Sequence, residues 1–507
     1  MNKREKVEFC KTILNRRFNY QESVQVLKTL QDLLEDCDPG KSLMSCGVGE
    51  VLSFIGELYQ KGDAEGDPIG FPRDNQIQCI VRKFERTARE KGINPFVDEI
   101  GEAWDSFYQK HYRFKLRAEI LRGRGELTGN LIHIQNTYAD GILVEFGVDL
   151  TNKNGGTSRL EEQLTKRRFK AVIISHGHAD HNGLIHLIHR DIPVFMGEKT
   201  LALYRNRYPE VDTSHFFTYH DGQSFEVGSK KHPIKVTPYL CDHSAPDSYM
   251  LLFEYLDRKI LYTGDFRSTG RKNYDKLLRK LPEEVTMLIC ERTNGDDPTK
   301  TSLSECALST QMYRIMKETQ KPVFILCPTE NIDRIVSAYR ASAKARRDFL
   351  VDLDQERILE TMGGNVPNAG SFSGVRVYFR SASDGIGKPF LDVRGKTVSL
   401  DELVGRTDYV MMVKTSTMGY LKKMVSHGAE LSGATLIYSL WSGYRETRNM
   451  ERFLRETELL GVRIVTCHTS GHATQKDIEA LISRTEPQEI LYVHQRKNDE
   501  TESGENG

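Results

Sequence analysis

A dense histidine cluster marks the stretch ISHGHADHNGLIHLIHR, which begins at Ile174. Its first part is a six-residue motif that contains His176, His178, Asp180 and His181. The motif follows the apolar run KAVIIS, which predicts a buried β-strand. In an extended segment, residues i and i+2 point the same way, so His176 and His178 can contact one ion. Asp180 and His181 follow at the start of a predicted helix and can face a second ion. Imidazole and carboxylate together suit zinc or manganese.

Two further histidines, His186 and His189, lie one turn apart in the predicted helix that follows the motif. Single histidines on a helix are more often structural or surface residues than ligands, and we interpret both in that way. For the six-residue motif, the interpretation without a metal is a polar helix start with solvated histidines. The density of ligand-type residues at one strand end favours a metal site instead.

Polar side chains also follow other predicted strands. Asp242 and His243 come after IKVTPYL, Asp265 after KILYTG, and His494 after EILYV. A single aspartate in such a place is usually a turn former or a helix cap. The repetition of the pattern favours a shared site at one edge of a sheet, because four ligands cannot complete two metal sites.

The order of the predicted elements indicates several domains, as expected for 507 residues. Apolar spacing predicts helices up to about residue 120. Short apolar runs separated by glycine-rich turns then predict β-strands. From about residue 300 to 460 strands alternate with helices, which is typical of an α/β unit with crossover connections. Residues 497–507 lack apolar side chains and are predicted to be a disordered tail.

The composition indicates a cytoplasmic globular protein. The 71 basic and 71 acidic residues balance, so contact with a polyanion would require a local groove. Nine cysteines without a CxxC pair suggest reduced thiols. The N-terminal MNKREKVEFC lacks the apolar stretch of a secretion signal, and the apolar runs are too short to span a membrane.

Six motifs occur in the order found in metallo-β-lactamase-fold nucleases of the β-CASP group, and they most resemble those of ribonuclease J. They are HGHADH, DHSAPDS, YTGDFR, LICERTNG, HTSGHATQKD and LYVH. The resemblance covers roughly residues 121–496 and implies an α/β fold: an αββα sandwich with an inserted α/β β-CASP domain, after a helical N-terminal extension. The expected segments are 1–120 for the extension, 121–296 for the first part of the sandwich, 297–465 for the insertion, and 466–496 for the return.

The resemblance also implies a site with two divalent ions, Zn²⁺ or alternatively Mn²⁺. One ion would be held by His176, His178 and His243, the other by Asp180, His181 and His494, with Asp265 between them. Asp180 would also orient the attacking water. Glu291 and His472 would form a pair beside the scissile phosphate, with His472 protonating the departing oxygen. Glu145 occupies the place of the family's first aspartate, which supports a ligand, and Asp149 is the alternative.

Substrate contacts are implied by the loop that contains His468, Thr469, Ser470 and Gly471, which resembles a loop of ribonuclease J that contacts backbone phosphate. A histidine at position 494 favours RNA over DNA in this group. Trp441 or Tyr444 could stack on a base. The basic clusters 166–170 and 343–347 either line a channel or are solvated.

We therefore predict a metal-dependent ribonuclease that hydrolyses single-stranded RNA by a two-metal hydroxide mechanism. A 5′ exonuclease mode is favoured and an endonuclease mode stays open. The alternatives are a DNA nuclease of the same fold, a non-nuclease metallo-hydrolase, and a catalytically weak scaffold, which only Glu145 supports. The N-terminal segment could recruit a protein partner, gate a channel or form a homo-oligomer interface.

Overall fold

The computed structural model describes residues 116–136, 141–150, 169–295, 302–380 and 393–495, apart from positions 125, 127, 231 and 394. The chain divides into two compact units, Met1–Lys115 and Leu116–Gly507. The first unit, with nearly all of the expected helical extension, lies outside the described residues, as does the expected tail. No helix among the described residues is both long and apolar enough to cross a bilayer.

The first sheet has six strands in the order β1-β2-β3-β4-β5-β6. They are β1 (Arg117–Arg122), β2 (Leu131–Gln135), β3 (Gly141–Val144), β4 (Phe169–Ile173), β5 (Val194–Gly197) and β6 (Phe216–Tyr219). Pairing is antiparallel from β1 to β3 and parallel from β3 to β6. Because β1 begins at Arg117, strand structure starts a few residues before the expected end of the helical segment at residue 120.

The second sheet also has six strands, in the order β19-β11-β10-β9-β8-β7. They are β7 (Phe225–Ser229), β8 (His232–Leu240), β9 (Tyr249–Tyr255), β10 (Arg258–Tyr262), β11 (Met287–Glu291) and β19 (Glu489–Val493). The strands β10, β11 and β19 run parallel to one another. Since β11 and β19 are neighbours, the long segment between them in the sequence is an insertion into this sheet.

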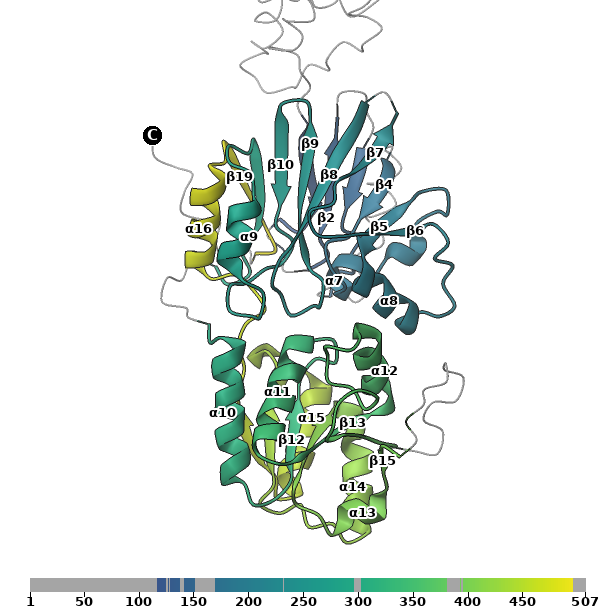
Figure 1. Ribbon diagram of the computed structural model, residues 1–507, viewed down its shortest axis with the longest axis vertical. Helices are drawn as coiled ribbons and strands as arrows, with labels where there is room; N and C mark the ends of the chain where they lie inside the picture. Colours follow the sequence, from purple (N-terminus) through teal and green to yellow (C-terminus); the bar gives the residue numbers. More distant parts are fainter. Residues whose placement is uncertain are drawn as a thin grey trace, which may run out of the picture. The chain divides into compact units, whose positions relative to one another are not determined.

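Alternating side chains join these two sheets into a sandwich with helices outside. On β9, Leu251 and Phe253 face the core shared with the first sheet, whereas Met250 and Leu252 face the helices α9 (Tyr274–Lys280) and α16 (Gln475–Thr485). Helix α8 (Glu198–Arg207) covers the other face of the first sheet. Figure 1 shows α9 and α16 beside β10 and β19. The predicted αββα sandwich is confirmed.

The third sheet has seven parallel strands in the order β15-β14-β13-β16-β12-β17-β18. They are β12 (Val323–Leu326), β13 (Asp348–Asp352), β14 (Val375–Tyr378), β15 (Thr397–Val398), β16 (Tyr409–Val413), β17 (Thr435–Tyr438) and β18 (Arg463–Thr466). This sheet and its helices form the inserted domain, by which we mean the described part of residues 302–466. The predicted α/β insertion is therefore present.

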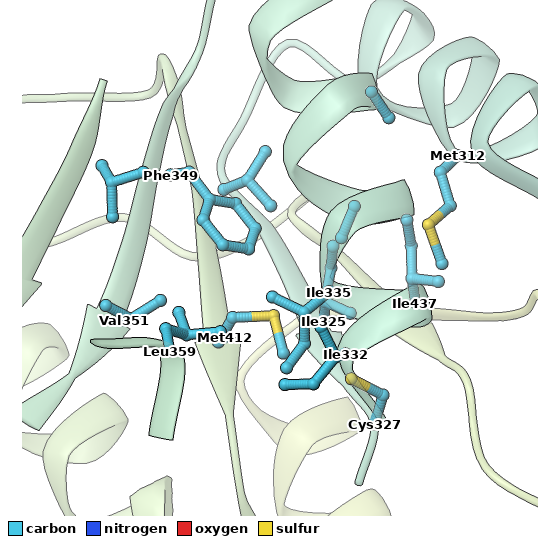
Figure 2. Close-up of a cluster of buried hydrophobic side chains, with 14 of the residues drawn as sticks. Met312, Ile325, Cys327, Ile332, Ile335, Phe349, Val351, Leu359, Met412 and Ile437 are labelled. Carbon is cyan, nitrogen blue, oxygen red and sulfur yellow. The ribbon is translucent and has the colours of Figure 1, made fainter. Parts of the chain in front are cut away.

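Helices cover both faces of this third sheet, which explains its continuous apolar strands. They are α10 (Glu305–Glu318), α11 (Ile332–Lys344), α12 (Leu353–Met362), α13 (Leu400–Val404), α14 (Met418–Ser426) and α15 (Arg448–Leu459). Figure 2 shows one of the two cores, where Ile325, Phe349 and Met412 of the sheet pack beside Ile335 of α11. On β12 the alternate residues Phe324 and Leu326 belong to the opposite core.

Candidate metal centre

The ends of four strands bring the predicted ligands together. His176 and His178 follow β4, His243 follows β8, Asp265 follows β10, and His494 follows β19. Asp180 and His181 lie in α7 (Ala179–Asn182), a single turn. The longer helix expected after the motif is absent, because only the short 3₁₀ segment η2 (Ile185–Leu187) follows.

His186 and His189 are exposed and lie in different local structures. His189 is 3.3 Å from the carboxylate of Asp191. Neither histidine belongs to a cluster of potential ligands among the described residues. They are surface residues in this structure, in line with the prediction.

Asp265 lies at the centre of the cluster. Its Oδ2 is 3.3 Å from His181 Nε2, 3.7 Å from His494 Nε2 and 3.8 Å from His176 Nε2. The same oxygen is 3.9 Å from His243 Nε2 and 3.7 Å from His472 Nδ1. Burial alone would raise the pKa of Asp265, but the imidazoles of His494, His181 and His472 hold it well below its usual value. Asp265 is therefore a carboxylate surrounded by ring nitrogens.

Three groups of side chains could each hold a cation, with ligand atoms within 4.8 Å of one another. They are His176, His178, His243 and Asp265; Asp180, His181 and His494; and Asp265, His472 and His494. The first two reproduce the sets expected from the sequence. The third also brings His472, expected only as an acid, to ligand distance.

Three rings converge within the first group. His243 Nδ1 lies 2.6 Å from the carbonyl oxygen of Gly471, so it donates there and leaves Nε2 with a free lone pair. That Nε2 is 3.1 Å from His178 Nδ1, and His176 Nε2 is 3.2 Å from the same atom. Burial lowers the pKa of all three histidines below 6.5, so the rings are neutral. Converging neutral imidazoles are suited to a shared cation.

Buried polar atoms without partners support the same interpretation. Among the described residues, the two ring nitrogens of His181 and the Oδ1 atom of Asp265 have no hydrogen-bond partner, although all three atoms are buried. Such groups carry a desolvation cost unless something satisfies them. The nitrogen and carboxylate set, with its unsatisfied atoms, fits divalent cations.

Glu145 lies behind His181, in the place predicted for a supporting carboxylate. Both carboxylate oxygens accept the N–H of Ser175 at 3.3 Å, and Oε1 is 3.4 Å from His181 Nδ1. Its φ of 65° lies in the left-handed region, as does the φ of 56° at His494. Such backbone conformations cost on the order of 1–3 kcal/mol in non-glycine residues and tend to occur at functional sites.

Gly147 allows the chain after β3 to run against the histidine motif. A Cβ at this position would lie 1.6 Å from the carbonyl oxygen of Asp180. Only glycine permits this approach, which fixes the start of α7 beside the segment after β3 that contains Glu145.

Glu291 connects two of the histidines. Its Oε2 accepts from His472 Nδ1 at 2.9 Å and from the hydroxyl of Thr293 at 2.7 Å. The Thr293 oxygen lies 2.8 Å from His494 Nδ1, so it accepts that proton and leaves His494 Nε2 free toward Asp180. Sequence reasoning missed Thr293, although it lies two residues after Glu291 in the quoted motif LICERTNG.

The environment of His472 favours its charged form. Burial alone would lower its pKa, but the carboxylates of Glu291 and Asp265 raise the pKa to about 9. The two predicted partners, Glu291 and His472, thus lie in direct contact beside Asp265.

A buried ion network lies next to this centre. Arg267 donates to Asp242 at 2.7 Å, to Glu305 at 3.2 Å and to Asp333 at 2.9 Å. Arg334 donates to the same Glu305 carboxylate at 3.1 Å. We call these side chains the arginine network. Asp242 belongs to it and also accepts two backbone N–H groups, so it is a structural residue.

The loop of residues 468–471 is held by this network. Arg334 donates to the carbonyl of Thr469 and lies 3.4 Å from His468 Nδ1, and Arg267 donates to the carbonyl of Ser470. Burial and the Arg334 charge lower the pKa of His468 to about 4. The Thr469 hydroxyl donates to Leu303, so it supports the loop and differs from the expected phosphate donor.

Comparison with known proteins supports the architecture. The sequence profile described as the metallo-beta-lactamase superfamily matches residues 153–358. A solved protein of unknown function from Enterococcus faecalis V583 superposes with a TM-score of 0.61 at 18% identity, over 78% of this chain and 97% of its own. The chain is thus a metallo-β-lactamase-fold protein.

Several curated proteins of this class are similar in sequence to the chain. Ribonuclease J of Mycobacterium tuberculosis is 25% identical over 69% of this chain and 62% of its own length. Ribonuclease J of Mycoplasma pneumoniae is 24% identical over 64% and 58%, and that of Helicobacter pylori 22% over 76% and 58%. This chain is therefore similar in sequence to ribonuclease J. It spans about three fifths of the length of these relatives.

Proposed function

We propose that this protein is a metal-dependent ribonuclease that acts on single-stranded RNA. The observation that carries the proposal is Asp265, whose one oxygen lies within 3.9 Å of ring nitrogens from five histidines. The names of the ribonuclease J relatives support RNA as the substrate.

Two divalent ions, with zinc the first choice and manganese the second, would occupy the two ligand sets expected from the sequence. When bound there, they supply a water of lowered pKa and positive charge for the developing oxyanion. His176, His178 and His243 present neutral nitrogens to one ion, and Asp180 Oδ2 and His494 Nε2 would face the other. The carboxylate of Asp265 lies close to histidines of both ligand sets.

Proton transfer falls to His472. Its Nδ1 donates to Glu291, so the ring is oriented with Nε2 available for a substrate oxygen. Since its pKa is raised to about 9, His472 holds a proton at neutral pH that it can give to the departing oxygen. Asp180, whose Oδ2 is 3.2 Å from His494 Nε2, orients the water that attacks the phosphorus.

Phosphate binding involves the loop of residues 468–471. The Ser470 hydroxyl accepts from the His472 N–H at 3.1 Å and from Asn294 at 3.3 Å, so its own proton is available for a phosphate oxygen. The Gly471 N–H is the second donor in this proposal. The arginine network holds this loop in place by binding its carbonyl groups. We propose 5′ exonuclease action on the basis of the resemblance to ribonuclease J alone.

A gel assay tests this function. The full-length protein is incubated with Mn²⁺ or Zn²⁺ and 5′-labelled single-stranded RNA, with the matching DNA alongside, and the reactions are repeated with chelator. We expect metal-dependent loss of RNA with release of a labelled mononucleotide. Discrete longer products would replace the exonuclease mode with an endonuclease mode. Equal cleavage of DNA, or no cleavage of either, would contradict the ribonuclease proposal.

A further inference from the structure

Two large aromatic side chains are exposed on the short segment η4 (Ser442–Glu446) and just before it. Trp441 is 49% exposed and Tyr444 is 47% exposed, and their rings meet edge to face with centroids 5.6 Å apart. Because Trp441 is exposed and not part of the core, it is available for the base stacking that the sequence suggested. Exposed aromatic pairs are enriched where proteins bind other molecules.

The local structure holds this aromatic pair in place. The Trp441 ring covers Gly443, where a Cβ would lie 2.2 Å from it. Arg445 donates to the Thr466 hydroxyl at 2.8 Å and its guanidinium lies 4.3 Å from the Tyr438 ring centroid. A rigid aromatic surface costs little ordering on binding.

The aromatic pair lies near the loop of residues 468–471. Arg445 of η4 donates to Thr466, two residues before that loop. The Gly471 carbonyl of the same loop orients His243, a proposed metal ligand. A nucleotide next to the reacting phosphate can therefore meet these rings.

A row of arginines continues from this point along α15. Arg448, Arg452 and Arg455 recur at intervals of four and three residues, so they share one face of the helix. All three are exposed, whereas Met450 and Phe453 on the opposite face are buried. We call the three residues the arginine stripe. It extends for about 10 Å along the helix, longer than a single nucleotide.

The stripe lines a surface hollow of about 560 Å³. Among the described residues, Asn449 and Glu451 also line this hollow, so one carboxylate accompanies the three guanidiniums. Arg452 pairs with Glu456 at 3.0 Å, but it is 71% exposed, and exposed pairs of this kind contribute little. The hollow is therefore a positively charged recess in a chain whose total charges balance.

We propose that η4 and α15 form a binding track for single-stranded RNA beyond the metal centre. A base stacks on Trp441 and Tyr444, and the following phosphates contact the arginine stripe. This inference rests on the proposed ribonuclease function and adds a site for nucleotides that are not themselves cleaved. Aromatic stacking joined to a basic groove is the usual combination for single-stranded nucleic acid.

The test compares variants that remove equal charge. The first variant is R448Q/R452Q/R455Q, and the control is K276Q/R279Q/K280Q, which removes three basic residues from α9. A third variant is Trp441→Ala. Each full-length protein is titrated, over a series of salt concentrations, into labelled phosphorothioate-protected oligouridine of 20 or 6 nucleotides. Cleavage of the unprotected 20-mer is measured in parallel, and thermal melting checks that every variant is folded.

We expect the stripe variant to bind the 20-mer at least about tenfold more weakly at low salt, with a smaller loss on the 6-mer. Losing three phosphate contacts reduces the slope of log K against log salt by about 2. Trp441→Ala weakens binding by about tenfold without changing that slope. The control changes neither quantity.

Equal binding by the stripe variant and the control would overturn the track, even if RNA is cleaved normally. RNA that binds in the expected pattern without being cleaved would support the track and contradict the ribonuclease proposal. No binding of RNA by the unaltered protein would overturn both proposals.

Discussion

The candidate metal centre and the arginine network are both buried clusters of charged and polar residues, and they share two stretches of chain. Asp242 belongs to the network and the next residue, His243, to the centre. Thr469 is bound by Arg334 in the network, whereas the Gly471 carbonyl orients His243 in the centre. The two clusters therefore lie next to each other and differ mainly in their chemistry.

In the arginine network every charge has a partner of opposite sign. Glu305 lies between Arg267 and Arg334, and Asp242 and Asp333 complete the set. The metal centre contains buried ring nitrogens and a carboxylate oxygen that lack hydrogen bonds among the described residues. The closed network links the sandwich to the insertion, whereas the unsatisfied atoms of the other cluster are suited to a cation.

The largest effect is expected from His178→Ala. Removing one ligand of the first set should reduce RNA cleavage by at least about a thousandfold, because the metal and the water it supplies are lost together. Bound metal, measured by mass spectrometry, should fall, while the melting temperature of the metal-free protein should change little. His186→Ala, at an exposed histidine of the same segment, is the control. Full activity in His178→Ala would contradict the ligand assignment.

The next effect concerns the network. In Arg334→Met, the fully buried carboxylate of Glu305 keeps only one of its two arginine partners. The loss should lower the free energy of unfolding by about 3–5 kcal/mol. The control is Arg376→Met, which breaks the more exposed pair with Glu402 and should cost less than about 1 kcal/mol. Chemical denaturation measures both. An equally small loss of unfolding free energy in the two variants would mean that the closed arginine network contributes no more to stability than an exposed ion pair.

Glu291→Gln tests a residue that belongs to the centre without being a proposed ligand. Cleavage should fall about 10- to 100-fold, the usual cost of losing a group that orients a catalytic histidine. In the metal-free protein, NMR titration should show His472 losing its proton near pH 9 in the unaltered chain. In the variant that midpoint should move toward 6.5. An unchanged midpoint would show that Glu291 does not control the charge of His472.

The smallest effect concerns Glu356 of α12, a buried carboxylate whose Oε2 accepts no hydrogen bond from the described residues. Burial raises its pKa to about 7 from an ordinary 4.5, and Oε1 accepts from the Ala369 N–H at 2.7 Å. The folded protein therefore keeps a proton that the unfolded chain releases between these two pH values. Stability should fall by roughly 2 kcal/mol as pH rises from 5 to 8.

Glu356→Gln keeps the acceptor and removes the charge, so the fall should be absent in that variant. The fall in stability is measured from the denaturation midpoints of both proteins at pH 5 and pH 8. Parallel behaviour of the two proteins would mean that Glu356 is ionised in the fold and is satisfied in another way.

Much of the fold could be predicted because the relevant information is local. Buried parallel strands have continuous apolar sequences such as YVMMV, and the helices between them show an apolar face. The shared edge for His243, Asp265 and His494 follows from the same principle, since each comes directly after a strand. The structure brings these three together with the HGHADH motif, although their role as ligands is still a proposal.

The arginine network could not be predicted in this way. Arg267, Glu305 and Arg334 lie in different elements, and no local pattern distinguishes a buried arginine from a surface one. The same is true of Thr293, whose hydroxyl connects Glu291 with His494 through tertiary contacts. The left-handed backbone at Glu145 and His494 is imposed by the surrounding sheet and not by residue type.

The pairing of β11 with β19 has a consequence for protein synthesis. Thr293 and His494, which meet beside Glu291, are separated by 201 residues that include the whole inserted domain. At about 5–20 residues per second a ribosome takes roughly 10–40 s to add them. A growing chain therefore carries the histidine motif well before it carries His494. For the proposed ribonuclease, this delay means that the messenger RNA under translation is not exposed to a completed active site on the same growing chain.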